Sequence, residues 1–171
     1  KKYFLLLLAA ILLTGVHGQN RQVDLSQNIP LQDILKKAKK QKKHVLLDFG
    51  SPRCSPCLFI KNKIFTIDSV ADFINERFVS VDYTEKKRLS KIYEVYTEPV
   101  LLICDANGRV MHRMEGKCTA GEMMARLRQG LDVKNNLTAQ KLMYDNGNRS
   151  SEFLINYLET LHIAGLRTQR D

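Results

Sequence analysis

Cysteine, acidic residues and long apolar runs are all scarce in this chain of 171 residues. Its four cysteines exclude a disulfide-dense scaffold, in which bridges take the place of a core. The longest apolar run, Tyr3 to Leu13, is shorter than the roughly 20 residues that span a bilayer. An apolar content of 44% excludes a disordered tail, and the length favours one domain with an appendage.

The shortage of acidic residues leaves a formal net charge of +9, which raises the question of nucleic-acid binding. Much of the excess lies in one short segment, in Lys36, Lys37, Lys39, Lys40, Lys42 and Lys43. Lysines gathered in this way are typical of a solvated helix face. We therefore expect no nucleic-acid partner.

The N-terminus has the pattern of a secretory signal peptide over residues 1–18. Lys1 and Lys2 precede the apolar run, and Val16–Gly18 supplies a cleavage site. An uncleaved membrane anchor is the alternative, which the short run disfavours. We expect a periplasmic or secreted protein of a bacterial envelope, monomeric and without a membrane span after cleavage, in a compartment where disulfides persist.

Hydrophobic periodicity predicts an α/β sandwich of three layers over residues 30–130, with a central mixed sheet and helices on both faces. Residues 19–29 are polar and are expected to form a flexible lead-in, and residues 131–171 a helical hairpin. Strands are expected at 45–49, 78–83, 100–103 and 109–114. One helix is expected to begin near Pro30, a second to follow the first two cysteines and break near Thr66, and a third to begin at a cap at Asp68–Ser69. Two more helices are expected over 85–96 and from Thr119 to near Gly130.

Cys54 and Cys57 stand two residues apart, between an apolar strand and the start of a helix. The unpaired N–H groups and positive dipole end of a helix favour a thiolate, and the adjacent Arg53 adds to that effect. This placement predicts a redox pair. The alternatives are a structural disulfide, which would close only a tiny loop, and half of a zinc site, for which Cys104 and Cys118 lack matching spacing. We expect no metal and no cofactor.

Asp48 interrupts the apolar strand that precedes the cysteines. A carboxyl group desolvated there has a raised pKa, which suits a general base; the alternative is a carboxylate that reaches solvent at the strand end. Cys104, which ends an apolar strand, is expected to be buried and inert. Cys118 is expected at the surface, with a regulatory or partner-linking thiol near the active site as the alternative.

Together these features resemble the thioredoxin superfamily: a strand with Asp48-Phe49, a turn, Cys-x-x-Cys, a later Pro99 that opens a strand and a Gly116 that ends the next. The resemblance covers roughly Ile29 to Gly130. The segment Ile64–Val79 is most similar to secreted bacterial thioredoxin-like proteins of the Bacteroidetes type.

The resemblance implies a role for each of these residues. Cys54 attacks a partner disulfide, Cys57 resolves the mixed disulfide, and Asp48 moves protons. Pro99 is implied to be a cis proline that leaves backbone groups free for substrate, and Gly116 to shape the substrate groove.

Four positions depart from the family pattern. Arg53 stands where thioredoxins have tryptophan, Ser80 about where they have a buried lysine, and Asn62 where they have proline. Glu98, beside Pro99, would repel a thiolate and oppose Arg53.

The sequence therefore predicts a thiol–disulfide oxidoreductase that acts on protein thiols and disulfides and exchanges electrons with an unidentified redox partner. The alternative is a non-catalytic thioredoxin-like module whose C-terminal helices bind a protein. Asp48 discriminates between them, because a binding module has no use for a buried acid beside the cysteines. The direction of the redox chemistry is not encoded in the motif.

Overall fold

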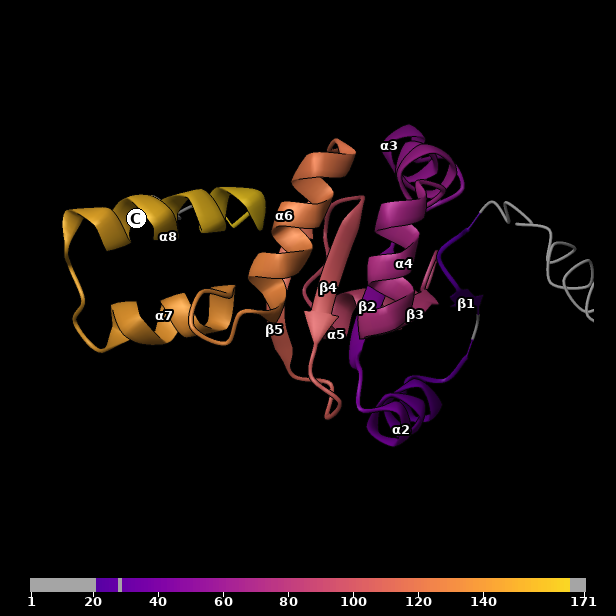
Figure 1. The fold of residues 1–171 in the computed structure, drawn as a ribbon, viewed down its shortest axis with the longest axis horizontal. Helices are drawn as coiled ribbons and strands as arrows, with labels where there is room; N and C mark the ends of the chain where they lie inside the picture. Colours follow the sequence, from indigo (N-terminus) through magenta and orange to yellow (C-terminus); the bar gives the residue numbers. More distant parts are fainter. Residues whose placement is uncertain (1–20, 28, 167–171) are drawn as a thin grey trace, which may run out of the picture.

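The computed structural model describes residues 21–27 and 29–166. A five-stranded sheet is covered by helices, and two further helices follow (Figure 1). The strands are β1 (Leu25–Gln27), β2 (His44–Phe49), β3 (Phe78–Asp82), β4 (Val100–Cys104) and β5 (Val110–Glu115). The helices are α2 (Leu31–Gln41), α3 (Ser55–Phe59), the π-helical turn η1 (Ile60–Ile64), α4 (Asp68–Arg77), α5 (Lys87–Ile92), α6 (Ala120–Leu131), α7 (Leu137–Asp145) and α8 (Ser151–Ile163).

The strands lie in the order β1-β3-β2-β4-β5. β1 and β2 run parallel to β3, whereas β4 is antiparallel to both β2 and β5. The sheet is therefore mixed, as predicted. Its register pairs Asp48 of β2 with Asp82 of β3, so that both side chains lie on the same face of the sheet.

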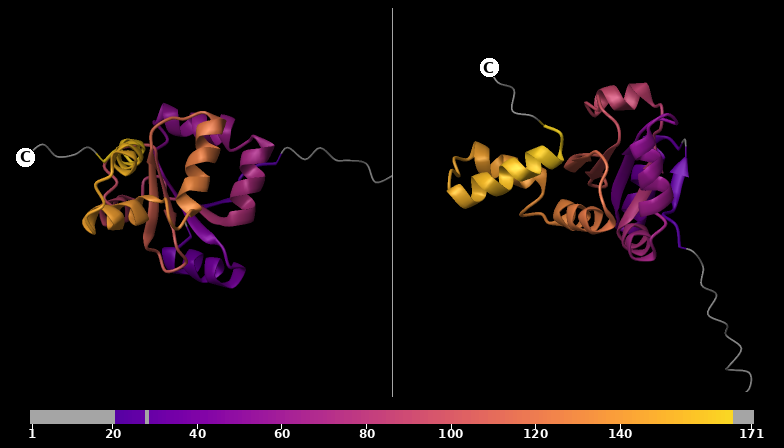
Figure 2. Two further views of the ribbon diagram at one scale, coloured as in Figure 1. Left: turned by 60° about the vertical axis from the view of Figure 1, so that its left-hand side comes forward. Right: turned by 90° about the horizontal axis from the view of Figure 1, so that it is seen from above.

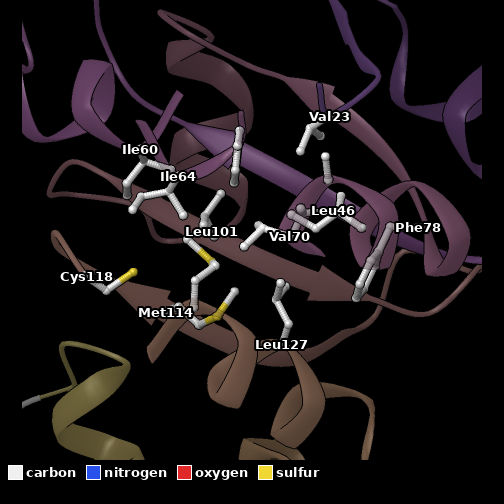
Figure 3. Packing of buried hydrophobic residues seen from close by; sticks show 14 of the residues in the cluster. Val23, Leu46, Ile60, Ile64, Val70, Phe78, Leu101, Met114, Cys118 and Leu127 are labelled. Atoms are coloured by element: carbon white, nitrogen blue, oxygen red, sulfur yellow. The ribbon is translucent and has the colours of Figure 1, made fainter. Parts of the chain in front are cut away.

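The central strand β2 is buried on both sides because its sequence is almost continuously apolar. Val45, Leu47 and Phe49 belong to a core with α2 and α5 on one face. Leu46 belongs to the core on the other face, where η1, α4 and α6 pack on the sheet (Figure 3). The predicted three layers are confirmed.

The lead-in predicted to be flexible contains a strand. β1 pairs in parallel with β3, and Val23 just before it is buried at 8% exposure. A polar segment of three residues has little strand signal of its own. The open edge of β3 supplies its hydrogen-bond partners, so the tertiary context decides its structure.

Two helix boundaries differ from the prediction. The charged helix expected over 85–96 is only Lys87–Ile92, because Glu85 and Glu94 on either side of it have positive φ values of 60° and 52°. At α4 the break near Thr66 is present, but Ile67 occupies the N-cap and makes no side-chain cap bond. The expected cap at Asp68–Ser69 is therefore wrong.

Thr119, by contrast, caps α6 as predicted. Its hydroxyl accepts a hydrogen bond from the Glu122 N–H, and the Glu122 carboxylate accepts one from the Thr119 N–H at 2.7 Å. We expect Thr119→Ala to lower the free energy of unfolding by about 1 kcal/mol in urea denaturation. Ser69→Ala is the control, since Ser69 caps nothing, and should change it by less than about 0.5 kcal/mol. Equal effects of the two substitutions would contradict the cap.

The predicted C-terminal hairpin is formed by α7 and α8, which project beyond the β5 edge of the sheet (Figures 1 and 2). Asn136 and Ser150 cap the two helices through side-chain acceptors. At its base the Leu137 N–H donates to His112 Nδ1, and Arg113 Nε donates to the Ala164 carbonyl at 2.9 Å. The hairpin is therefore fixed to β5 by buried polar contacts.

The signal peptide predicted for residues 1–18 lies outside the described residues. Among residues 21–27 and 29–166, no helix combines the length and the apolar character that crossing a bilayer requires.

Candidate active site

The two cysteines lie where β2 gives way to α3, and they are joined in a disulfide with an S–S distance of 2.02 Å. Cys54 occupies the N-cap of α3, and its Sγ accepts a hydrogen bond from the Cys57 N–H at 3.1 Å. Cys54 is half-buried, whereas Cys57 is 2% exposed. A partner in solvent can therefore reach Cys54 and not Cys57, as the implied order of attack requires.

Two glycines give the site its shape. A Cβ on Gly50 would lie 2.9 Å from Cys57 Sγ, so no larger residue fits between the end of β2 and the disulfide. Gly116 has a φ of 82°, and its N–H donates to the Pro99 carbonyl at 3.0 Å. The Glu98–Pro99 peptide is cis, as the resemblance implied. Gly116 and Pro99 are thus neighbours, joined by a main-chain hydrogen bond.

Asp48 is buried on the η1 side of the sheet at 2% exposure. Among the described residues its Oδ2 has no hydrogen-bond partner, but the Lys61 ammonium lies 3.5 Å away. Burial raises the pKa of Asp48 to about 6, Lys61 opposes this rise, and Asp82 adds to it. The raised pKa predicted from the sequence is confirmed.

Lys61, which no sequence motif singled out, contacts this acid. It lies one helical turn after Cys57 and donates to Asp82 Oδ2 at 2.7 Å and to Thr84 Oγ1 at 3.1 Å. Burial alone would lower the pKa of Lys61, but the two carboxylates outweigh it and raise that pKa. For Asp82, burial alone would raise the pKa, but the hydrogen bonds from Lys61 and Thr84 outweigh this effect. The pKa of Asp82 is therefore below its usual range.

These groups connect the buried acid to solvent. Cys57, Lys61, Asp82 and Thr84 line one cavity of about 570 Å³ that opens at the surface. The Lys61 ammonium, which contacts both Asp48 and Asp82, therefore links the buried carboxyl group to a cavity that is open to solvent. A signal for Lys61 existed in its spacing of four residues from Cys57, which puts both side chains on one helix face.

Glu98 lies beside the disulfide, as its position before Pro99 suggested. Its carboxylate oxygen and the sulfur atoms of Cys54 and Cys57 all lie within 4.8 Å of one another. Ser51 Oγ donates to Glu98 Oε2 at 2.6 Å. Arg53 is exposed in the turn before Cys54. The two opposing charges expected near the cysteines, positive Arg53 and negative Glu98, are therefore both present, and Glu98 lies directly beside the sulfur atoms.

The other two cysteines are free thiols buried in the two cores. Cys104 is fully buried as predicted, and burial raises its pKa to about 12. The surface position expected for Cys118 is wrong. It is 6% exposed among the apolar side chains of the Leu46 core (Figure 3), because the loop after Gly116 turns inward there, and burial raises its pKa.

The match to known proteins agrees with this geometry. A profile of the thioredoxin-like domain matches residues 31–131, which is more than half of the chain. The chain belongs to the thioredoxin-like domain family. Its resemblance to thioredoxins, predicted from Cys54, Cys57 and Pro99, is confirmed.

Individual relatives of this thioredoxin-like protein are distant in sequence. Thioredoxin Y, chloroplastic, from Oryza sativa subsp. japonica is 25% identical over 96 residues, which are 55% of each chain, so the match spans about half the length of this curated relative. The solution structure of a candidate disulphide-isomerase from Bacteroides thetaiotaomicron superposes with a TM-score of 0.60 and 26% identity, covering 67% of this chain and 97% of that one. A thioredoxin from Thermus thermophilus shares the fold with a TM-score of 0.56 and 21% identity, covering 67% and 92%.

Proposed function

We infer that this thioredoxin-like protein is a thiol–disulfide oxidoreductase that exchanges disulfides with proteins of a bacterial envelope. The observation that carries the inference is the half-buried Cys54 paired with buried Cys57, together with Asp48, a buried acid of raised pKa whose neighbour Lys61 lines the same cavity as Cys57. The name of the Bacteroides neighbour, a candidate disulphide-isomerase, supports the same reaction class.

The reaction follows from the exposure of the two sulfurs. In the reduced protein the Cys54 thiolate attacks one sulfur of a substrate disulfide, and the other substrate sulfur leaves as a thiolate. Asp48 then takes the Cys57 proton, and the Cys57 thiolate attacks Cys54 Sγ. The second substrate thiolate leaves, so the substrate gains two electrons and the protein ends as the Cys54–Cys57 disulfide. A dithiol partner restores the reduced form.

The envelope location rests on the sequence. The basic residues and apolar run of residues 1–18 support export, and an oxidising compartment is where a protein disulfide finds substrates. Fractionation of cells that express the full chain tests it: the protein should appear in the periplasmic or secreted fraction without residues 1–18, and recovery in the cytosol at full length would contradict export. We also expect a monomer.

Asp48 argues against the alternative of a purely binding module. Keeping a carboxyl group at 2% exposure in an apolar strand costs folding free energy above its pKa, and a module that only binds gains nothing from this cost. Reduction of insulin by dithiothreitol tests the choice. We expect the wild-type protein to accelerate it and Cys54→Ser to return the rate to that of dithiothreitol alone. Equal rates of insulin reduction for the wild-type protein and Cys54→Ser would contradict the oxidoreductase assignment.

A further inference from the structure

Glu98 is unexpected beside a redox pair. A carboxylate next to a thiol repels the thiolate and so opposes its activation, yet one Glu98 oxygen and both cysteine sulfurs lie within 4.8 Å of one another. Two sulfurs and one carboxylate oxygen at such distances form a ligand set that a divalent cation can bind. The sequence argued against zinc because Cys104 and Cys118 could not complete a site, but Glu98 supplies the third ligand.

We propose that the reduced protein binds one Zn²⁺ through Cys54 Sγ, Cys57 Sγ and the Glu98 carboxylate. Zinc in proteins accepts cysteine sulfur at about 2.3 Å and carboxylate oxygen at about 2.0–2.2 Å, and sites with three protein ligands leave the fourth tetrahedral position to water. Two thiolates select zinc over magnesium or calcium, which require oxygen ligands.

The groups around the ligands are arranged as in a metal site. The Cys57 N–H already donates to Cys54 Sγ, a bond that persists when that sulfur is a metal-bound thiolate. Ser51 holds Glu98 Oε2 at 2.6 Å, which orients the carboxylate and leaves Oε1 for the metal. Hydrogen bonds of this kind to ligating atoms tune and strengthen metal binding.

The site is open to solvent from two sides. Ser51 and Glu98 line a cavity of about 1000 Å³, and Ser51 and Cys57 line the second cavity of about 570 Å³. Two Zn–S bonds at a tetrahedral angle separate the sulfurs by about 3.8 Å. The Cα atoms of the cysteines are 5.2 Å apart, so side-chain rotation alone provides this separation once the disulfide is opened.

Binding depends on the redox state and leaves the metal at the same oxidation state. A dithiol or a phosphine supplies two electrons to the disulfide, which takes up two protons and becomes a dithiol. Zn²⁺ then displaces both thiol protons. Because the metal occupies both sulfurs, the zinc form cannot attack a substrate disulfide, and zinc withdraws reduced protein from the exchange cycle.

The test is a zinc titration of the full chain, free of any metal-binding tag. The protein is reduced with tris(2-carboxyethyl)phosphine, the phosphine is removed under nitrogen, and Zn²⁺ is added in competition with a chromophoric chelator. We expect one Zn²⁺ per reduced chain and none for the disulfide form. With Co²⁺ instead, a thiolate-to-cobalt charge-transfer band should report sulfur ligation.

Three variants locate the site. Ser51→Ala should weaken zinc binding by about 10–100-fold, as loss of an outer-shell partner does, and Glu98→Gln by at least as much. Glu85→Gln is the matched control, because Glu85 lines the same cavity as Glu98 but lies outside the ligand cluster, and it should bind as wild type. Binding by the disulfide form, or unchanged affinity in Glu98→Gln, would overturn the proposal. The insulin assay in metal-free buffer decides the proposed function separately.

Discussion

Cys57→Ser is expected to hold the protein in a stable mixed disulfide with its substrate. Cys54 remains accessible at the start of α3 and still attacks, but no second thiol lies behind it to release the substrate. The intermediate, which the wild-type protein resolves within one turnover, should then persist through electrophoresis without reductant. Insulin serves as the defined substrate, and the adduct should disappear when dithiothreitol is added.

Cys54→Ser is the matched control for this trap. This variant keeps Cys57, which is only 2% exposed. Its sulfur should therefore be unable to attack the disulfide of a folded or unfolded substrate, and no adduct should form. Adducts of equal amount from both variants would show that the two cysteines are equally accessible, and the assigned order of attack would be wrong.

Asp48→Asn is expected to remove a pH dependence from disulfide release. With the pKa of Asp48 at about 6, the wild-type carboxylate is ionised at neutral pH and can take the Cys57 proton. The wild-type rate should therefore rise as the pH increases through about 6. In the asparagine variant this rise should vanish and the rate near pH 7 should fall. A stopped-flow profile that is unchanged would contradict the role of Asp48.

The same substitution should stabilise the folded protein. A carboxyl pKa raised by folding costs nothing below the unfolded value near 4, and the cost grows until the pH passes about 6. Removing the ionisable group should thus raise the free energy of unfolding at pH 7 by about 1–3 kcal/mol, with the gain lost below pH ~4. Asp82→Asn is the control of opposite sign, because its lowered pKa contributes stability above pH ~4 that the variant loses.

Lys61→Met tests whether the Lys61 ammonium sets the pKa of Asp48. Lys61 lowers the pKa of Asp48, so its removal should move the inflection of the pH–rate profile above 6 and slow disulfide release at pH 7. The distant Lys141 is the control, because its ion pair with Asp145 is exposed on α7 and its substitution by methionine should leave the profile in place. An inflection that stays at the wild-type pH in Lys61→Met would show that the ammonium does not set the acidity of Asp48.

The sequence predicted those parts of the fold that depend on local pattern. A nearly continuous apolar run indicated the doubly buried strand β2, and the Thr119 cap indicated the start of α6. Cys54 and Cys57 could be singled out as a redox pair from their spacing, and Asp48 as a candidate base from its charge inside an apolar strand, whereas the order of attack came from the resemblance. Pro99 and Gly116 were placed by resemblance, and the structure brings them together.

Contacts between distant segments could not be predicted in this way. Lys61 reaches Asp48 and Asp82 only because η1 lies over the paired ends of β2 and β3, which no local pattern records. Ser80, at the position of the family's lysine, is instead a buried serine whose hydroxyl has no partner among the described residues. Cys118 is buried by a loop whose direction is set by packing, not by its own polarity.

The hairpin of α7 and α8 affects how much of the outer edge of the sheet is open to another chain. β5 is an outer strand, and an uncovered strand of six residues would offer its main-chain groups to another copy of the chain. Thr138 Oγ1 instead donates to the Val110 carbonyl, and Arg113 ties Ala164 to the same strand. At the opposite border β1 is only three residues long. The hairpin thus covers part of the β5 border, and the short β1 leaves few main-chain groups at the opposite border, so both borders offer little room for strand-to-strand aggregation.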